Sequence, residues 1–208
     1  MRWLGVVLSV ALGIGNIVVP VCKAGECTDD AIGRLASVQG EVQFKREGQT
    51  EWVLVAGRES FCAGDRLRVL RGGRAAVVLV NESIVRINQN STVTFRHPEN
   101  ERVTVLGLLK GIIHIFSHRP RALEVVTPYV NGTVEGTEFV VTSKEGIASI
   151  TVFEGKVVAT NDQGRLDVTS GQSVSAGKGK APRFETVVRP RDAVAWTLYY
   201  PSIIDQSG

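Results

Sequence analysis

The chain has 208 residues, which allows one substantial domain with a small additional element but not two full-sized domains. Hydrophobic residues make up 43% of the sequence and charged residues 22%, so we expect a packed core rather than long disorder. Arg2 and Lys23 are the only charged residues among the first 24, which leaves 22 basic residues against 21 acidic ones and no electrostatic case for nucleic-acid binding.

The first 24 residues are typical of a cleaved secretory signal peptide. Arg2 supplies a short positive region, the run from Leu4 to Val21 is apolar, and Cys22 and Ala24 place small residues at −3 and −1 before Gly25. An uncleaved membrane anchor is the alternative, although glycines and a proline interrupt the run. A lipoprotein signal is disfavoured because a bulky valine directly precedes Cys22. We therefore expect a periplasmic or secreted protein.

Export leaves Cys27 and Cys62 as an even pair in an oxidising compartment. We predict a disulfide that ties the start of the mature chain to the turn from Phe61 to Asp65. In the chain-entropy account such a bond stabilises by roughly 3–4 kcal/mol. The alternative is two separate buried thiols, which an oxidising compartment disfavours.

Short strands separated by turns fill most of the chain that follows. In Thr92–Arg96 apolar and polar residues alternate strictly, which is typical of a strand with one buried face. We predict a turn at Asn131–Gly132 and separate strands at Ile147–Phe153 and Lys156–Thr160. Residues 25–176 are thus expected to form an all-β domain of short stacked strands, either a β-roll, a solenoid-like stack or a sandwich.

The end of the chain changes character. Residues 177–189 are expected to be a linker or last strand, and residues 190–208 a short helical tail. Trp196, Tyr199 and Tyr200 concentrate aromatic area on this tail and mark it as a possible interaction site, either against the β domain or in a homo-oligomer.

The sequence offers little catalytic chemistry. His114 and His118 are four residues apart on a predicted strand, where they are separated by about 13 Å, too far to share one zinc ion. Glu135 and Glu138 are the nearest approach to the paired carboxylates of a glycosidase, with an acid and a turn residue on a β-edge as the alternative. We therefore predict no catalytic residue, no metal site and no cofactor.

The segment from Val125 to Val141 resembles the core of the FecR domain family. The residues that carry the resemblance are a threonine–proline turn, a valine followed by Gly-Thr and then Phe, and two later glycines: Thr127, Pro128, Val134, Gly136, Thr137, Phe139, Gly155 and Gly171. Upstream, the segment from Cys62 to Val69 resembles the entry into the domain in exported members. The resemblance extends over roughly residues 32–176.

The resemblance implies an all-β periplasmic domain without known catalytic activity. The best-known members are membrane-spanning regulators of sigma factors. In this chain the apolar segment already begins at Leu4, so we expect no cytoplasmic anti-sigma region ahead of it. The segment from Pro190 to Pro201 is similar to the junction that precedes tetratricopeptide repeats in larger exported proteins.

These observations predict a non-enzymatic envelope protein whose β surface binds another protein or a glycan. Contact with the membrane is expected only through an uncleaved leader. The alternative is a membrane-anchored signalling relative of the FecR-type sigma-factor regulators. A glycan hydrolase that uses Glu135 and Glu138 is a third hypothesis, kept for testing.

Overall fold

The computed structural model describes Cys27, residues 31–96 and residues 103–186; for residues 118–122 and 135 it describes the backbone alone. The all-β prediction is confirmed, because these residues form 14 strands in one sheet and contain no helix. Nothing in the described ranges is a helix that could cross a membrane. The predicted signal peptide (1–24) and the short C-terminal helix (190–208) lie outside the described residues.

The strands follow one another in chain order with short connections. They are β1 (Gly33–Gln39), β2 (Val42–Lys45), β3 (Val53–Leu54), β4 (Ser60–Phe61), β5 (Arg66–Val69), β6 (Arg74–Leu79), β7 (Ile84–Ile87), β8 (Ser91–Arg96), β9 (Thr104–Val126), β10 (Asn131–Lys144), β11 (Ile147–Asn161), β12 (Gly164–Thr169), β13 (Ser173–Gly177) and β14 (Arg183–Glu185). All pairings between them are antiparallel.

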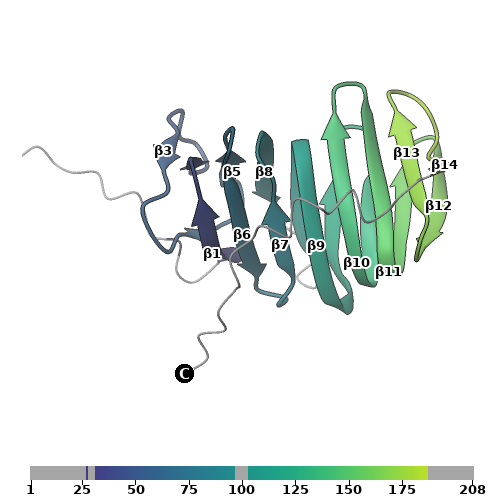
Figure 1. Ribbon diagram of the computed structural model, residues 1–208, viewed down its shortest axis with the longest axis horizontal. Helices are drawn as coiled ribbons and strands as arrows, with labels where there is room; N and C mark the ends of the chain where they lie inside the picture. Colours follow the sequence, from purple (N-terminus) through teal and green to yellow (C-terminus); the bar gives the residue numbers. More distant parts are fainter. Residues whose placement is uncertain (1–26, 28–30, 97–102, 187–208) are drawn as a thin grey trace, which may run out of the picture.

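Two branches of the sheet meet in its long central strands. The main path runs β14-β13-β11-β10-β9-β7-β6-β1-β4, and a second runs from β9 through β8, β5 and β2 to β3, with β12 paired to β11. Figure 1 shows β9, β10 and β11 as the long strands between the two ends of the molecule. These three strands therefore set the shape of the whole domain.

The central strands bend back on themselves. The backbone N–H of Gly146 donates a hydrogen bond of 2.9 Å to the hydroxyl of Tyr129, although β10 lies between these two residues. A straight strand of that length would hold its ends roughly 40 Å apart. The two halves of β10 consequently face each other, as the layers of a sandwich do. Gly132 in the first half lies against Ile150 of β11, which pairs with Val141 in the second half.

Two predicted strand boundaries are wrong, and local chemistry explains each. The turn lies at Thr127–Val130 rather than at Asn131–Gly132, because the Thr127 hydroxyl accepts from the N–H groups of Tyr129 and Val130 and donates to the Val130 carbonyl. The predicted strands on either side of Gly155 are one strand, β11, because this glycine lies opposite a bulge of β10 at Gly136 and Thr137 and the pairing resumes beyond it.

A single hydrophobic core lies between the two halves of the sheet. The alternation predicted for β8 is confirmed, since Val93 and Phe95 are buried while Thr92 and Thr94 are half-buried. Phe61 stacks on Phe95 with ring centroids 4.6 Å apart. Both rings are essentially inaccessible to solvent, which is typical of residues that contribute about 2 kcal/mol or more each through burial.

The stretch expected to be a linker or last strand, residues 177–189, contains an ordered strand as far as it is described. β14 pairs with β13 through Ser175↔Arg183 and Ser173↔Glu185. Described residues end at Thr186, immediately after this edge strand.

Candidate functional site

The bend in the central strands is made by two glycines, and we call Gly136, Thr137 and Gly155 the elbow. Gly136 and Gly155 have φ values of 60° and 79°, a left-handed conformation that favours glycine. A side chain on Gly155 would collide with the Gly136 carbonyl and lie 2.8 Å from Thr137 Cγ2. The register of β10 against β11 shifts at the same place, between Glu135 and Phe139. The close approach of the β10 and β11 backbones thus explains why glycines occupy positions 136 and 155.

The other residues quoted for the FecR resemblance support this bend from both sides. Val134 and Phe139 are fully buried in the core on the two arms of β10, and Thr127 closes the turn that precedes it. Pro128 is exposed within that turn. Gly171 lies in the turn between β12 and β13 with φ 80° and open space around it, and its N–H donates to the Val152 carbonyl of β11 at 2.9 Å. The structure therefore gathers the motif along the central strands and the turns beside them.

A hollow of about 300 Å³ opens at the elbow, and we call it the elbow groove. It is lined by residues of β9, β10 and β11: Phe116, Ser117, Gly136, Thr137, Glu138 and Glu154. The strand register explains the gathering, because Glu138 pairs with Phe116 on one side and with Glu154 on the other. The family motif thus builds this concave surface through its own backbone geometry.

Beside the groove, Glu138 is held by a buried histidine. His114 is 1% exposed, and its Nε2 lies 2.9 Å from Glu138 Oε1. Burial, followed by the nearby positive charge of Arg86, lowers the pKa of His114 to about 4. The imidazole is therefore neutral at pH 7, and its contact with Glu138 is a hydrogen bond from Nε2–H rather than an ion pair.

Aromatic rings hold the imidazole in place. The Phe116 ring lies 4.3 Å from the His114 ring centroid and the Phe153 ring 6.0 Å from it. The Arg86 guanidinium lies 5.0 Å from the Phe116 ring, in reach of a cation–π contact. A neutral imidazole suits this position, because burying a charged group among apolar rings would cost free energy.

The two carboxylates of the groove repel each other. Burial first, and then the negative charge of Glu154, raises the pKa of Glu138, against an opposing effect of Arg86. The Thr137 hydroxyl is buried and has no hydrogen-bond partner among the described residues. A positively charged group in the groove would relieve the repulsion, and a polar one could reach the hydroxyl.

The acid pair at the groove is Glu138 with Glu154, not the pair Glu135 and Glu138 considered from the sequence. Glu138 belongs to the groove, but its cross-strand neighbour is Glu154, which the sequence did not single out. For Glu135 only the backbone is described, opposite Lys156 and Pro120. Metal-ligand clusters of three or more His, Cys, Asp or Glu residues do not occur in the described part of the chain. The signal that could have found Glu154 is its position next to the motif glycine at 155.

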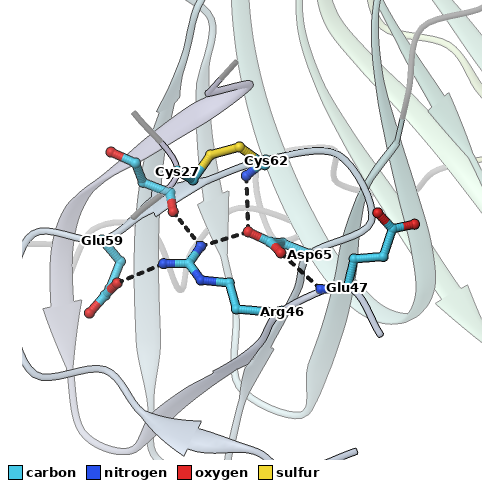
Figure 2. The surroundings of a disulfide bond; sticks show 7 residues. Cys27, Arg46, Glu47, Glu59, Cys62 and Asp65 are labelled. Carbon is cyan, nitrogen blue, oxygen red and sulfur yellow. Dashed lines mark hydrogen bonds and ion pairs between the residues drawn. A yellow bond between two sulfur atoms is a disulfide. The ribbon is translucent and has the colours of Figure 1, made fainter. Parts of the chain in front are cut away.

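A second polar cluster lies at the other end of the molecule, beside the disulfide. The predicted bond between Cys27 and Cys62 is present, with Cα atoms 5.7 Å apart. Asp65 is 2% exposed and accepts from the N–H groups of Cys62 at 3.0 Å and Glu47 at 3.1 Å. Figure 2 shows how this carboxylate also meets the guanidinium of Arg46.

Arg46 completes this cluster. Its Nη1 lies 2.6 Å from Asp65 Oδ2 and donates to the Ser60 carbonyl at 2.7 Å, while Nη2 lies 3.2 Å from Glu59 Oε2 (Figure 2). A buried carboxylate with this many donors is structural, because its oxygens are already satisfied. We therefore place the candidate functional site at the elbow groove and not here.

The predicted interaction residues Trp196, Tyr199 and Tyr200 lie outside the described residues. His118 is described only by its backbone in β9.

Comparison with known proteins agrees with this fold. Two crystal structures of a putative anti-sigma factor from Parabacteroides distasonis, at 1.65 Å and 2.50 Å resolution, superpose with a TM-score of 0.56 and 14% identity. The superposition covers 64% of this chain and 64% or 63% of those chains, so this chain spans less than two thirds of their length. At this identity the likeness concerns the fold.

No curated protein sequence matches the chain. The family model described as FecR protein matches residues 65–158, a narrower stretch than the sequence resemblance suggested. That stretch contains β5 to β10 and most of β11, including the elbow and all the motif residues except Gly171. Residues 65–158 are therefore the part of this chain that is similar to the FecR protein family.

Proposed function

We propose that the chain is a non-enzymatic, FecR-type regulatory interaction module of the periplasm or the cell exterior, and that the elbow groove binds a partner protein. One observation carries the proposal: three residues of the FecR motif shape the groove. Gly136 and Thr137 line it, and Gly155 sets the close approach of β10 and β11. A motif that only stabilised the core would not need to expose an acidic hollow.

The groove favours a partner that inserts a basic side chain. The groove carries two carboxyl groups, Glu138 and Glu154, beside a neutral His114 and one nearby guanidinium, that of Arg86. A lysine or arginine placed between the two carboxylates would relieve their repulsion, and its methylene groups would pack on Phe116. The chemistry of recognition is thus an ion pair in a partly desolvated site.

A glycan hydrolase is the second candidate, and the raised pKa of Glu138 is the observation that favours it. Glu138 and Glu154 are cross-strand partners, whose Cβ atoms are typically about 5 Å apart, so their carboxyl groups can reach the separations of paired catalytic carboxylates. Against this reading, Glu138 is already held by His114. Incubation with peptidoglycan and chromogenic glycosides tests it, since turnover abolished by Glu138→Gln would replace the binding proposal.

Photo-cross-linking in the source bacterium tests the binding proposal. A benzoylphenylalanine at Phe116, in the groove, should give a discrete adduct of higher mass. The same residue at Leu109, which is 62% exposed on the same strand, serves as the control and should not give that adduct. Identical adducts from both positions would show that the groove is not the binding site.

The compartment is proposed on the sequence of the first 24 residues. Export with cleavage predicts a mature protein that begins at Gly25 and is recovered in the periplasmic or culture fluid. N-terminal sequencing of the exported protein tests this. Recovery of intact Met1 in the membrane fraction would instead support the membrane-anchored alternative.

A further inference from the structure

Positive side chains gather on the outer side of the second branch of the sheet, which runs from β9 through β8, β5 and β2 to β3. Alternate residues of these strands, such as Phe44, Leu67 and Val93, belong to the core, so the residues between them point away from it. The outward positions carry five cations, which we call the basic face: Lys45, Arg66, Arg68, Arg96 and Lys110.

The strand register brings these cations together. Lys45 on β2 pairs directly with Arg66 on β5, and Arg68 is joined to Lys110 on β9 through Thr92 on β8. Three strand spacings of about 4.8 Å separate β2 from β9, so the basic face is roughly 14 Å wide. Cations from four strands therefore lie on one continuous surface.

The protein does not neutralise the basic face. None of its five cations forms an ion pair with a carboxylate in the part of the chain that the structure describes. Arg68 instead donates to Gln43 Oε1 at 2.6 Å and lies 4.2 Å from the centre of the Trp52 ring. Like charges directly opposite each other on neighbouring strands destabilise a sheet, and Lys45 and Arg66 are such a pair. A bound anion would relieve this repulsion.

We propose that the basic face binds an anionic polysaccharide, a polymer with repeated carboxylate or phosphate groups. Cations spread over a strand surface complement repeated negative charges better than one small anion. Gln43, Thr92 and Thr94 lie between the cations and offer amide and hydroxyl groups to sugar hydroxyls. A protein interface would favour apolar side chains at such central positions, whereas the exposed Leu54 lies at the β3 margin.

The basic face shares no residue with the lining of the elbow groove, so this binding is separate from the proposed function. Titration calorimetry of the purified protein with polygalacturonate, dextran phosphate and neutral dextran tests it. At least one anionic polymer should bind at low salt and bind at least about tenfold more weakly when salt shortens the range of surface charges. The stronger of the two identifies the anionic group. Failure of both to bind, or equal binding of neutral dextran, would overturn the proposal.

Charge reversal tests whether the basic face carries the binding. Lys45→Glu with Arg66→Glu should weaken binding at least about tenfold, and it keeps a like-charged pair at the same positions, so stability should change little. Lys178→Glu with Lys180→Glu is the matched control, an equal change of net charge at exposed positions between β13 and β14, at the other end of the molecule (Figure 1). The control should bind as the unchanged protein does. Equal weakening in both variants would contradict a specific basic face.

Lys110→Glu, at an exposed position of β9, is a second variant that does not alter the Lys45–Arg66 pair, and it should also weaken polymer binding severalfold. Unchanged polymer binding in this variant would contradict the proposal. Vesicles of phosphatidylglycerol separate a polysaccharide from a lipid surface. Vesicle binding that Lys110→Glu abolishes, without binding of either anionic polymer, would assign the basic face to lipid and overturn the proposal.

Discussion

Gly155 and the carbonyl of Gly136 approach so closely that a Cβ on Gly155 would overlap the carbonyl oxygen. Gly155→Ala should therefore lower the free energy of unfolding by about 3–4 kcal/mol, because it adds a backbone clash to a left-handed φ of 79°. Gly171→Ala is the matched control, with φ 80° and open space, and should cost about 1 kcal/mol. Urea denaturation measures both. Equal losses would mean that close approach is not what requires Gly155.

The disulfide between Cys27 and Cys62 should stabilise the oxidised protein by roughly 3–4 kcal/mol through the loop that it closes, across a sequence separation of 35. Cys62→Ser should lower the melting temperature under oxidising conditions and leave the protein in dithiothreitol little changed. Thermal melts with and without reductant measure this. An unchanged melting temperature in oxidising buffer would mean that the loop is held by other contacts.

The Arg46–Asp65 pair is buried, and Asp65→Asn leaves the Arg46 guanidinium with the more exposed Glu59 as its remaining carboxylate among the described residues. The variant should cost about 3 kcal/mol, because the guanidinium stays mostly enclosed after it has lost its shorter ion pair. Asp167→Asn, which removes the partner of Lys156 at an exposed position, should have no measurable effect. Equilibrium unfolding of the two variants compares them; similar values would show that burial of Asp65 does not matter.

Stability should fall as the pH drops from about 6.5 to 4, on account of His114. Its folded pKa is about 4, below the ordinary 6.5, so the unfolded chain binds a proton in this interval and the folded chain does not. The loss is on the order of 3 kcal/mol. Glu138 acts in the opposite direction just above pH 4.5, because its raised pKa lets the folded chain take up the proton first.

His114→Gln isolates this effect, since the amide can still donate to Glu138 but does not titrate. The variant should show a flatter dependence of unfolding free energy on pH between 6.5 and 4, measured by urea denaturation at each pH. A wild-type slope retained in the variant would assign the pH dependence to other groups.

How far the sequence predicted this structure depends on the range of the interactions. The alternation in Thr92–Arg96 is a local signal and the even pair Cys27 and Cys62 is a pairwise one, and each was sufficient for its prediction. The continuity of β9 could not be predicted from the sequence, because Gly111 resembles a turn glycine there, whereas in the structure it has a φ of 108°, lies against Ser91 and continues the strand. A glycine in a bulge and a glycine in a turn look alike in the sequence.

The elbow groove could not be predicted from the sequence, because its residues come together only through the strand register. Glu138 and Glu154 lie far apart in the sequence and meet only because the β10–β11 pairing shifts by a bulge between Glu135 and Glu138. His114 comes to Glu138 through the pairing of β9 with β10. The motif glycines indicated an unusual backbone conformation, but the sequence alone does not predict which side chains that conformation brings together.

Charge reversal in the groove tests the central claim most directly. Glu154→Lys should abolish the adduct formed from benzoylphenylalanine at Phe116, because a partner's basic side chain would then meet a positive charge. Glu145→Lys, an exposed change in the β10–β11 hairpin, is the matched control and should leave the adduct yield unchanged. An adduct that persists at full yield in Glu154→Lys would contradict recognition by the elbow groove.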